Sequence, residues 1–249
     1  MKQSTDKYVY DVLIVGSGAA GFNAAIHLYD LGVKNIAIVT ENLKAGTSRN
    51  TGSDKQTYYK LSVAGDFPDS PIKMAKTFFA GGAMDGDIAL CESAHSLQEF
   101  FHLVNLGVDF PFNSYGEFVG YKTDHDPCQR GSSIGPYTSK KMTEVLEAEV
   151  KRKGIKIIDK TKIIDILIHK NIAVGIIGIS NNSLITCLSE NIVFATGGPA
   201  VIYKNTVYPK SQFGASGILA RNGVEFVNLQ EWQYGMGSIK FRWNLSGSF

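Results

Sequence analysis

A glycine-rich turn between a strand-like and a helix-like segment is the feature that most constrains this chain. Residues 8–15 read YVYDVLIV, a β-branched and aromatic run typical of a buried parallel strand. Apolar residues recur at helical spacing over 19–31, and a second strand is predicted over 35–40. Such a βαβ start predicts a parallel sheet with a right-handed crossover. The turn that joins the first strand to the helix is Gly16-Ser17-Gly18-Ala19-Ala20-Gly21, which fits the pattern GxGxxG.

This strand, turn and helix predict a dinucleotide-binding site. Glycine permits the tight turn, the approach of the backbone to a pyrophosphate and close helix packing, while the helix N-terminus supplies N–H donors and positive potential. An acidic residue about 20 positions after the last glycine is expected to bind a ribose, and Glu41 stands there. Thr40, at the predicted strand end, is the alternative ribose contact. A solvent-exposed Glu41 and a purely structural glycine turn are the alternative interpretations.

The rest of the chain is predicted to complete a single α/β domain. Residues 41–59 are polar and aperiodic, as in a functional loop, and helices are predicted over 70–79, 87–106 and 138–153. Residues 108–136 are rich in glycine, proline and aromatic residues and are predicted to be irregular surface. A strand over 155–158 precedes three short strands within 162–188, which turn at residues 170–171 and 181–182. A last buried strand, 191–195, ends at Thr196-Gly197-Gly198.

Composition excludes several classes of protein. The 25 Lys+Arg residues nearly balance the 23 Asp+Glu residues, so nucleic acid is not an expected partner. No stretch approaches the ~20 apolar residues of a membrane span, and the N-terminus lacks a signal-peptide pattern. We therefore expect no integral membrane segment and a cytoplasmic location. Three widely spaced cysteines argue against a disulfide framework.

No metal site is expected in the loop that contains Asp124, His125, Asp126 and Cys128. These side chains alternate within a loop and lack the spacing of a zinc or calcium site. Cys128 stands near Arg130, and a neighbouring cation lowers the pKa of a thiol. We nevertheless favour the interpretation that Cys128 is an unreactive loop cysteine over the alternative that it is a reactive thiolate.

Five segments give the chain a specific resemblance. The glycine turn, the strand end IAIVTE, the loop AGTSRNTG, the later ATGG turn and the RNGVEFV segment occur in one order. In that order they resemble the FAD-binding domain of the succinate dehydrogenase, fumarate reductase and aspartate oxidase flavoproteins. The likeness spans nearly the whole chain. It implies an α/β fold over residues 1–249, a Rossmann-like FAD-binding domain with a parallel sheet and a small antiparallel β insertion, without the capping and C-terminal parts of that family.

The resemblance also implies which residues bind the cofactor. In this family the flavin and pyrophosphate lie along the loops between the first glycine turn and the ATGG turn. NAD is the competing ligand for the glycine turn, but the antiparallel strands before FATGG favour FAD, and a simple strand-ending turn is the alternative for ATGG. Together with Ala19, Ala20, Thr40 and Glu41, the implicated residues are Gly16, Gly18, Gly21, Thr47, Ser48, Gly52, Thr196, Gly197 and Gly198.

Three departures from the family pattern bear on the chemistry. Relatives with covalent flavin carry a histidine where this chain has Arg49, so the FAD is expected to be non-covalent, with the Arg49 cation near reduced flavin. The acidic residue of a TGDG-like turn is absent from residues 213–217, FGASG. The substrate-binding histidine of a QFHPTG-like segment is absent from residues 233–237, QYGMG, which weakens succinate or fumarate as the substrate.

The expected function is that of an FAD-dependent oxidoreductase that transfers hydride between flavin and a small organic acid. The family's substrate-binding and proton-donor arginines lie downstream of the segment present here. We therefore expect the chain alone to be inactive, as a truncated chain or one half of a split enzyme, whose partner is a cap-supplying or electron-transfer subunit. Two alternatives stay open: a non-catalytic FAD-binding fragment that needs a partner chain, and an NAD-dependent dehydrogenase.

Overall fold

The computed structural model describes residues 6–50, 56–123, 126–198, 214–227 and 229. These residues fall into two compact units. The first unit contains 6–50, 143–198 and 214–226, and the second contains 56–123 and 126–142 with 227 and 229. The assignment of residues 1–249 to one FAD-binding domain stays a prediction.

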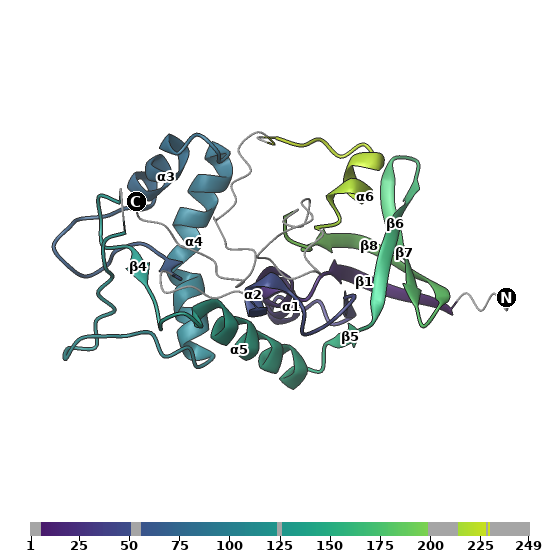
Figure 1. Ribbon diagram of the computed structural model, residues 1–249, viewed down its shortest axis with the longest axis horizontal. Coiled ribbons are helices and arrows are strands. Elements are labelled where there is room, and N and C mark those ends of the chain that lie inside the picture. Colours follow the sequence, from purple (N-terminus) through teal and green to yellow (C-terminus); the bar gives the residue numbers. More distant parts are fainter. Residues whose placement is uncertain (1–5, 51–55, 124–125, 199–213, 228, 230–249) are drawn as a thin grey trace, which may run out of the picture. The chain divides into compact units, whose positions relative to one another are not determined.

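A six-stranded sheet organises the first unit (Figure 1). Its order is β5-β2-β1-β8-β7-β6; the first four strands are mutually parallel, and β8, β7 and β6 are antiparallel neighbours. The predicted α/β class, with a parallel sheet and a small antiparallel insertion, is confirmed. The strands are β1 (Asp6–Val15), β2 (Ile36–Val39), β5 (Lys156–Ile158), β6 (Thr161–His169), β7 (Ile172–Ser180) and β8 (Ser183–Phe194).

The division of the last strand into two pieces, one ending by residue 188 and one over 191–195, is wrong. β8 runs without a break because it pairs with β7 over its first half and with β1 over nearly its whole length. The polar Ser189 is accommodated within the strand, since its hydroxyl lies within hydrogen-bonding distance of the carbonyl oxygens of Asp11 and Asn191. The two predicted hairpin turns, 170–171 and 181–182, are confirmed, and all four of their residues have positive φ.

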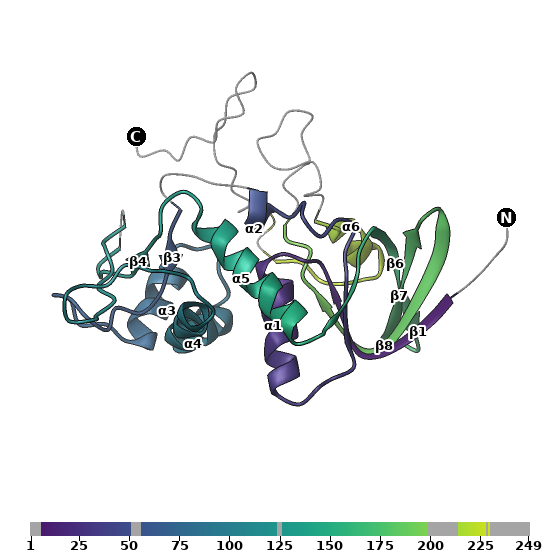
Figure 2. The same ribbon diagram turned by 90° about the horizontal axis from the view of Figure 1, so that it is seen from below.

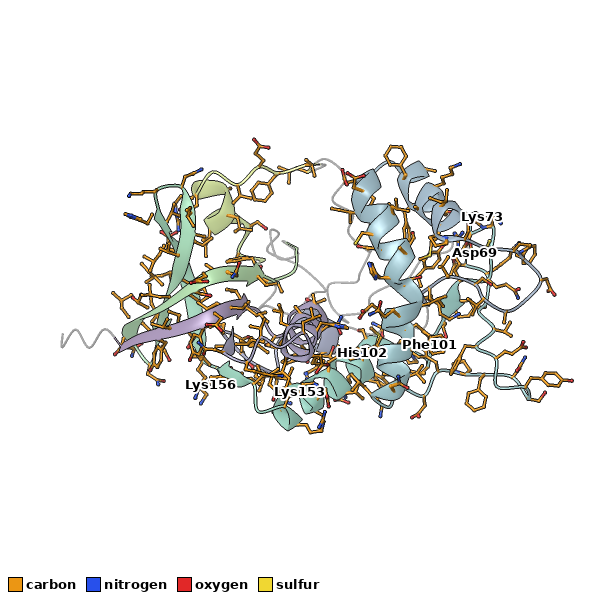
Figure 3. All side chains as sticks on the ribbon, turned by 180° about the vertical axis from the view of Figure 1, so that it is seen from behind. Asp69, Lys73, Phe101, His102, Lys153 and Lys156 are labelled. Atoms are coloured by element: carbon orange, nitrogen blue, oxygen red, sulfur yellow. The ribbon has the colours of Figure 1, made fainter. Side chains whose placement is uncertain are left out.

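Helices cover the parallel part of this sheet. α1 (Ala19–Asp30) packs against β1 and β2 and buries Phe22, Ala25 and Ile26. Every residue of β2 is buried, as expected for a strand covered on both faces. The last turns of α5 (Thr138–Arg152) lie beside α1 (Figure 2), and Lys153, just after α5, forms an ion pair with Asp30. Figure 3 labels Lys153 and Lys156 where the chain passes from α5 into β5.

The second unit is built on two packed helices, α3 (Pro71–Ala80) and α4 (Gly86–Asn105). The side chains of Ser70 and Asp85 accept hydrogen bonds from N–H groups in the first turn of each helix, which caps its N-terminus. A short antiparallel pair, β3 (Tyr58–Tyr59) and β4 (Gly131–Ser132), completes the unit, which also holds the first residues of α5. Among the described residues, no helix has both the length and the apolar character to cross a membrane.

The prediction of irregular surface over 108–136 is wrong in part. Phe110 is buried against Phe100 and Tyr58, and β4 lies within this stretch. Arg130 is fully buried because its polar groups are satisfied: its guanidinium donates to both oxygens of Asp69 at 2.7 Å. We call Arg130 and its partners the Arg130 cluster, which consists of Arg130, Asp69, Asp126, Tyr59 and Thr77. Asp69 lies just before α3 (Figure 3).

Candidate functional site

The glycine turn after β1 has the geometry that its sequence pattern requires. Gly16 has φ of 111°, and a Cβ there would lie 2.3 Å from the carbonyl oxygen of Ala195. A Cβ on Gly21 would lie 2.1 Å from the carbonyl oxygen of Gly16. At Gly18 a Cβ would sit 3.4 Å from the Ser48 hydroxyl, which is an ordinary contact. Gly16 and Gly21 are thus required by packing, whereas glycine at position 18 keeps open the space in front of the turn.

This turn borders a pocket of about 650 Å³, at the carboxyl ends of β1, β2 and β8. That volume is typical of small-molecule sites, and the carboxyl ends of parallel strands are where ligands bind in sheets of this kind. All residues lining the pocket belong to the first unit. They include Gly16–Ala20 of the turn, Thr40, Glu41 and Asn42 after β2, Ala45, Gly46, Thr47 and Ser48, Thr161, Lys162 and Ile163 of β6, Ala195, Thr196 and Gly197, and Gly214 and Ala215.

The two candidate ribose contacts lie together at this pocket but in different environments. Thr40 is buried, and its hydroxyl shares a hydrogen bond of 2.8 Å with the Ser17 hydroxyl of the glycine turn. Glu41, one residue further, is exposed and also lines the pocket. Thr40 therefore ties the end of β2 to the turn, while Glu41 presents a solvated carboxylate.

The loop after β2 supplies a second wall through α2 (Thr47–Asn50) and the residues before it. Thr47 and Ser48 both line the pocket, and the Ser48 hydroxyl accepts a hydrogen bond from the Ala19 N–H at 3.3 Å. No acidic residue stands in the first turn of α1, and its N-cap residue, Gly18, supplies no side-chain hydrogen bond. The positive end of the α1 dipole is therefore directed at the pocket without a neighbouring negative charge in that turn.

The turn after β8 closes the pocket from the side of α6 (Ser216–Arg221). The Thr196 hydroxyl donates to the Gly214 carbonyl at 2.8 Å, which joins this turn to the segment where the family's acidic turn would stand. Gly197 lines the pocket with φ of 71°, whereas Gly198 is exposed and is not among the lining residues. Ala215 takes a left-handed conformation with φ of 46°, and it lines the pocket without an acidic side chain.

Sequence reasoning missed the wall formed by β6. Thr161, Lys162 and Ile163 line the pocket, and Lys162 brings an exposed cation to it. The start of β6 reaches this edge because β5 ends at the same edge and the chain turns back at once: the Thr161 N–H donates to the Thr40 carbonyl. The signal available in the sequence is the three-residue gap between the strands predicted over 155–158 and from 162.

Arg49 has contacts other than those expected. It is not among the described residues that line the pocket; its guanidinium binds the Glu147 carboxylate on α5 and lies 3.5 Å from Glu144. Lys44 donates to both oxygens of Glu147 at 2.7 Å. Burial alone would raise the pKa of Glu147, but hydrogen bonds from Lys151 and Lys44 and the charge of Arg49 outweigh it and hold the pKa below its usual value.

Some expected site residues lie outside the described part of the chain. They are Gly52, Phe213, the segment 233–237, Asp124 and His125. Of the loop considered for a metal, Asp126 and Cys128 are buried, and the Cys128 N–H donates to an Asp126 oxygen at 3.0 Å. In the ranges that the structure covers, His, Cys, Asp and Glu form no group of three or more suited to a metal ion.

The residues around the pocket fit a dinucleotide. Two glycine-containing turns, one after β1 and one after β8, face the same cavity, and Gly18 itself places no side chain in it. Helix α1 begins at the first turn, and an exposed carboxylate follows β2. This is the arrangement in which a parallel sheet binds a pyrophosphate and its ribose.

The fold and pocket define a dinucleotide-binding α/β protein, and comparison with known sequences specifies the kind. Residues 11–247 match the FAD binding domain family, to which this chain belongs. Among curated proteins, L-aspartate oxidase of Clostridium acetobutylicum is 28% identical over 201 residues, which is 79% of this chain and 44% of that protein. A chain of the fumarate reductase (CoM/CoB) of Methanothermobacter marburgensis is 27% identical over 92% of this chain and 43% of that protein.

Solved structures show the same fold. The Sdh1 complex of Mycobacterium smegmatis in the apo form superposes with a TM-score of 0.77 at 18% identity, over 88% of this chain and 39% of that one. E. coli quinol fumarate reductase superposes with a TM-score of 0.72 at 20% identity, over 83% of this chain and 36% of that one. The chain thus spans less than half the length of these relatives.

Proposed function

We propose that the pocket of the first unit binds FAD non-covalently and that the chain is the FAD-binding part of an oxidoreductase of the succinate dehydrogenase and fumarate reductase type. The observation that carries the proposal is the convergence of two glycine turns, after β1 and after β8, on one pocket. Membership of the FAD binding domain family supports the choice of FAD over NAD. When bound, FAD supplies a group that accepts and donates hydride.

The residues of the chain have distinct roles in holding this cofactor. Backbone N–H groups at the start of α1 stabilise the pyrophosphate, because the first N–H groups of a helix have no partner within it. Glu41 accepts from the ribose hydroxyls, since the Thr40 hydroxyl is already bonded to Ser17. Ser48 and Thr196 fix the loops on either side. Non-covalent attachment is proposed because arginine at position 49 cannot form the histidyl bond of the covalent relatives.

The activity of the whole protein is part of the same proposal. We assign it hydride transfer between flavin and a small organic acid, in the cytoplasm, with a further chain segment or a partner subunit supplying the cap and the substrate-binding cations. The support is the likeness to L-aspartate oxidase and to the fumarate reductase (CoM/CoB) chain, of which this chain spans 44% and 43%.

The decisive experiment is a titration of the chain with FAD, FMN and NAD, followed by flavin fluorescence and calorimetry. Saturable FAD binding is expected, and binding of NAD in preference to both flavins would replace this proposal by the NAD-dependent one. Acid precipitation of the loaded protein should leave the yellow colour in the supernatant. A coloured pellet would contradict non-covalent attachment.

Two matched pairs of variants test the residue roles. Gly18→Ala places a methyl in front of the turn and should weaken FAD binding roughly tenfold, as added methylenes do in tight pockets. Gly217→Ala, where a Cβ meets nothing within 4 Å, is the control with unchanged binding. Glu41→Gln should weaken binding about tenfold through the loss of a charged hydrogen bond. A larger loss in Thr40→Val, at an unchanged unfolding midpoint, would assign the ribose contact to Thr40 instead.

A further inference from the structure

A buried carboxylate contacts the loop that lines the pocket, and the inference drawn from it rests on the proposed function. Glu147, on α5, is 3% exposed and is contacted by three cations: Lys44, Arg49 and Lys151. We call these four residues the Glu147 cluster. Lys151 belongs to the same helix, one turn further on, at 2.5 Å from a Glu147 oxygen. The other two cations come from the loop after β2, 103 and 98 residues away in sequence.

The two loop cations flank a pocket-lining segment in the sequence. Ala45, Gly46, Thr47 and Ser48 all line the pocket, and they are the residues between Lys44 and Arg49. One carboxylate thus anchors both ends of a four-residue lining segment. The segment is also folded on itself, since the Asn50 side-chain amide donates to the carbonyls of Lys44 at 2.7 Å and Gly46 at 2.9 Å. Its inner side meets α1 where Ser48 accepts from the Ala19 N–H.

The burial of these charges indicates a strong local constraint. The Glu147 and Arg49 side chains are 4% and 9% exposed, so their interaction is little screened by water. The Arg49 Nε is buried and has no hydrogen-bond partner, which shows that the guanidinium is held by its terminal nitrogens alone. Loss of the carboxylate would leave a buried cation whose remaining acidic neighbour in the described ranges is Glu144 at 3.5 Å, and the segment would lose the group that joins its two ends.

We propose that Glu147 is a positioning residue for the FAD pocket, which holds Lys44 and Arg49 and thereby preorganises the lining segment Ala45, Gly46, Thr47 and Ser48. When the wall is ordered in only a fraction of the molecules, a ligand that requires the ordered wall has an apparent Kd equal to its intrinsic Kd divided by that fraction. If removal of the carboxylate charge leaves about one molecule in ten ordered, the apparent Kd for FAD rises about tenfold. Arg49 thus acts through Glu147 on the loop and not as a cation beside the flavin.

The chain offers a closely matched control for this proposal. Glu149 lies two residues along α5, and like Glu147 it pairs with a lysine one turn further on, Lys153 at 3.3 Å. Its other partner is Arg152, also outside the pocket loop. Glu149→Gln therefore removes one carboxylate charge and its helical ion pairs, as Glu147→Gln does, but leaves the lining segment anchored.

The experiment compares wild type, Glu147→Gln and Glu149→Gln by three measurements: the Kd for FAD, the thermal unfolding midpoint without FAD, and trypsin cleavage without FAD. Trypsin cuts after lysine and arginine, so the bonds following Lys44 and Arg49 report directly on the segment. In Glu147→Gln we expect a Kd about tenfold higher and cleavage at these two bonds several times faster. In Glu149→Gln both quantities should stay within about twofold of wild type, because the segment keeps its anchor.

Further variants keep the proposal falsifiable if Glu147→Gln folds poorly. Lys44 is 59% exposed, so Lys44→Met should fold normally and raise the Kd in the same direction by a smaller factor. Its effect should not add to that of Glu147→Gln, because both remove one interaction. Additive effects, an unchanged Kd in a folded Glu147→Gln, or equal losses in Glu149→Gln would each overturn the proposal. Failure of wild type to bind FAD would instead overturn the proposed function, while the cleavage pattern still reports whether Glu147 orders the segment.

Discussion

The two charge clusters of this chain are arranged with opposite polarity. The Glu147 cluster in the first unit surrounds one buried carboxylate with cations, two of which, Lys44 and Lys151, are more than half exposed. The Arg130 cluster in the second unit surrounds one buried cation with two carboxylates, Asp69 and Asp126, which are 0% and 2% exposed. Of the two clusters, the first alone contains charged groups that reach bulk water.

This difference determines what each cluster is suited to do. A fully buried ion pair is costly to break, because every charge left behind is desolvated and unpaired. The Arg130 cluster therefore fixes the loop around Cys128 to the start of α3 in one arrangement. In the Glu147 cluster Arg49 is buried with the carboxylate, but the two lysines can return to water at little cost, so the Lys44 end of the pocket loop is held by an interaction that can be adjusted.

The largest effect is expected for Arg130→Met. It leaves Asp69 and Asp126 buried without a cation, and the free energy of unfolding should fall by about 3–5 kcal/mol. Urea denaturation followed by circular dichroism measures the loss. Arg152→Met is the control, since that side chain is 70% exposed, and its midpoint should stay close to wild type. A loss in Arg130→Met no larger than in this control would mean that the buried cluster contributes no net stability.

A smaller loss is expected for Glu147→Gln. The variant keeps the shape of the side chain and leaves only Arg49 as a buried cation, so the free energy of unfolding should fall by about 1–3 kcal/mol. The same urea titration applies. A loss equal to that of Arg130→Met would remove the distinction between an adjustable and a fully buried cluster.

Acid should weaken the first unit through the same carboxylate. The pKa of Glu147 is lower in the folded protein than in an exposed chain, so its contribution to stability is complete above the unfolded value and is lost as the pH falls. Between about pH 5 and pH 3 the unfolding free energy of wild type should therefore fall more steeply than that of Glu147→Gln. Parallel pH profiles of the two proteins would contradict this assignment.

The smallest effect is expected at high pH in the second unit. Burial, and then the charge of Glu99, raises the pKa of Tyr58 to about 12. A raised pKa gives stability that is complete below the ordinary value of 10 and is lost as the pH approaches 12. Tyr58→Phe should reduce this alkaline loss without changing stability at neutral pH. Thermal unfolding across this range checks it, and an unchanged alkaline slope would speak against the burial of the phenol.

The parts of the molecule that could be predicted from the sequence are those determined by residues close together along the chain. The glycine turn, the helix start at Ser70 and the hairpin turns are encoded by local steric and capping preferences, and the structure has them. The pocket residues that were missed, such as Lys162, are brought to the pocket by contacts between distant segments: β5 pairs with β2, and the Thr161 N–H donates to the Thr40 carbonyl. The Glu147 carboxylate lies 98 residues from Arg49, and no local pattern marks such a partner.

The pairing of β1 with β8 has a consequence for the order in which this protein is made. β1 is synthesised well before β8, the strand with which it forms its longest pairing. Asp11 of β1 and Ser189 of β8 are hydrogen-bonded but lie 178 residues apart in the sequence, so this contact forms only after residue 189 has been synthesised. Contacts so distant along a chain form slowly. Until then one edge of β1 has unpaired backbone groups, a template for pairing with the wrong strand. Because Ala195 also closes the turn at Gly16, the nucleotide pocket is completed only after residue 195 has been synthesised.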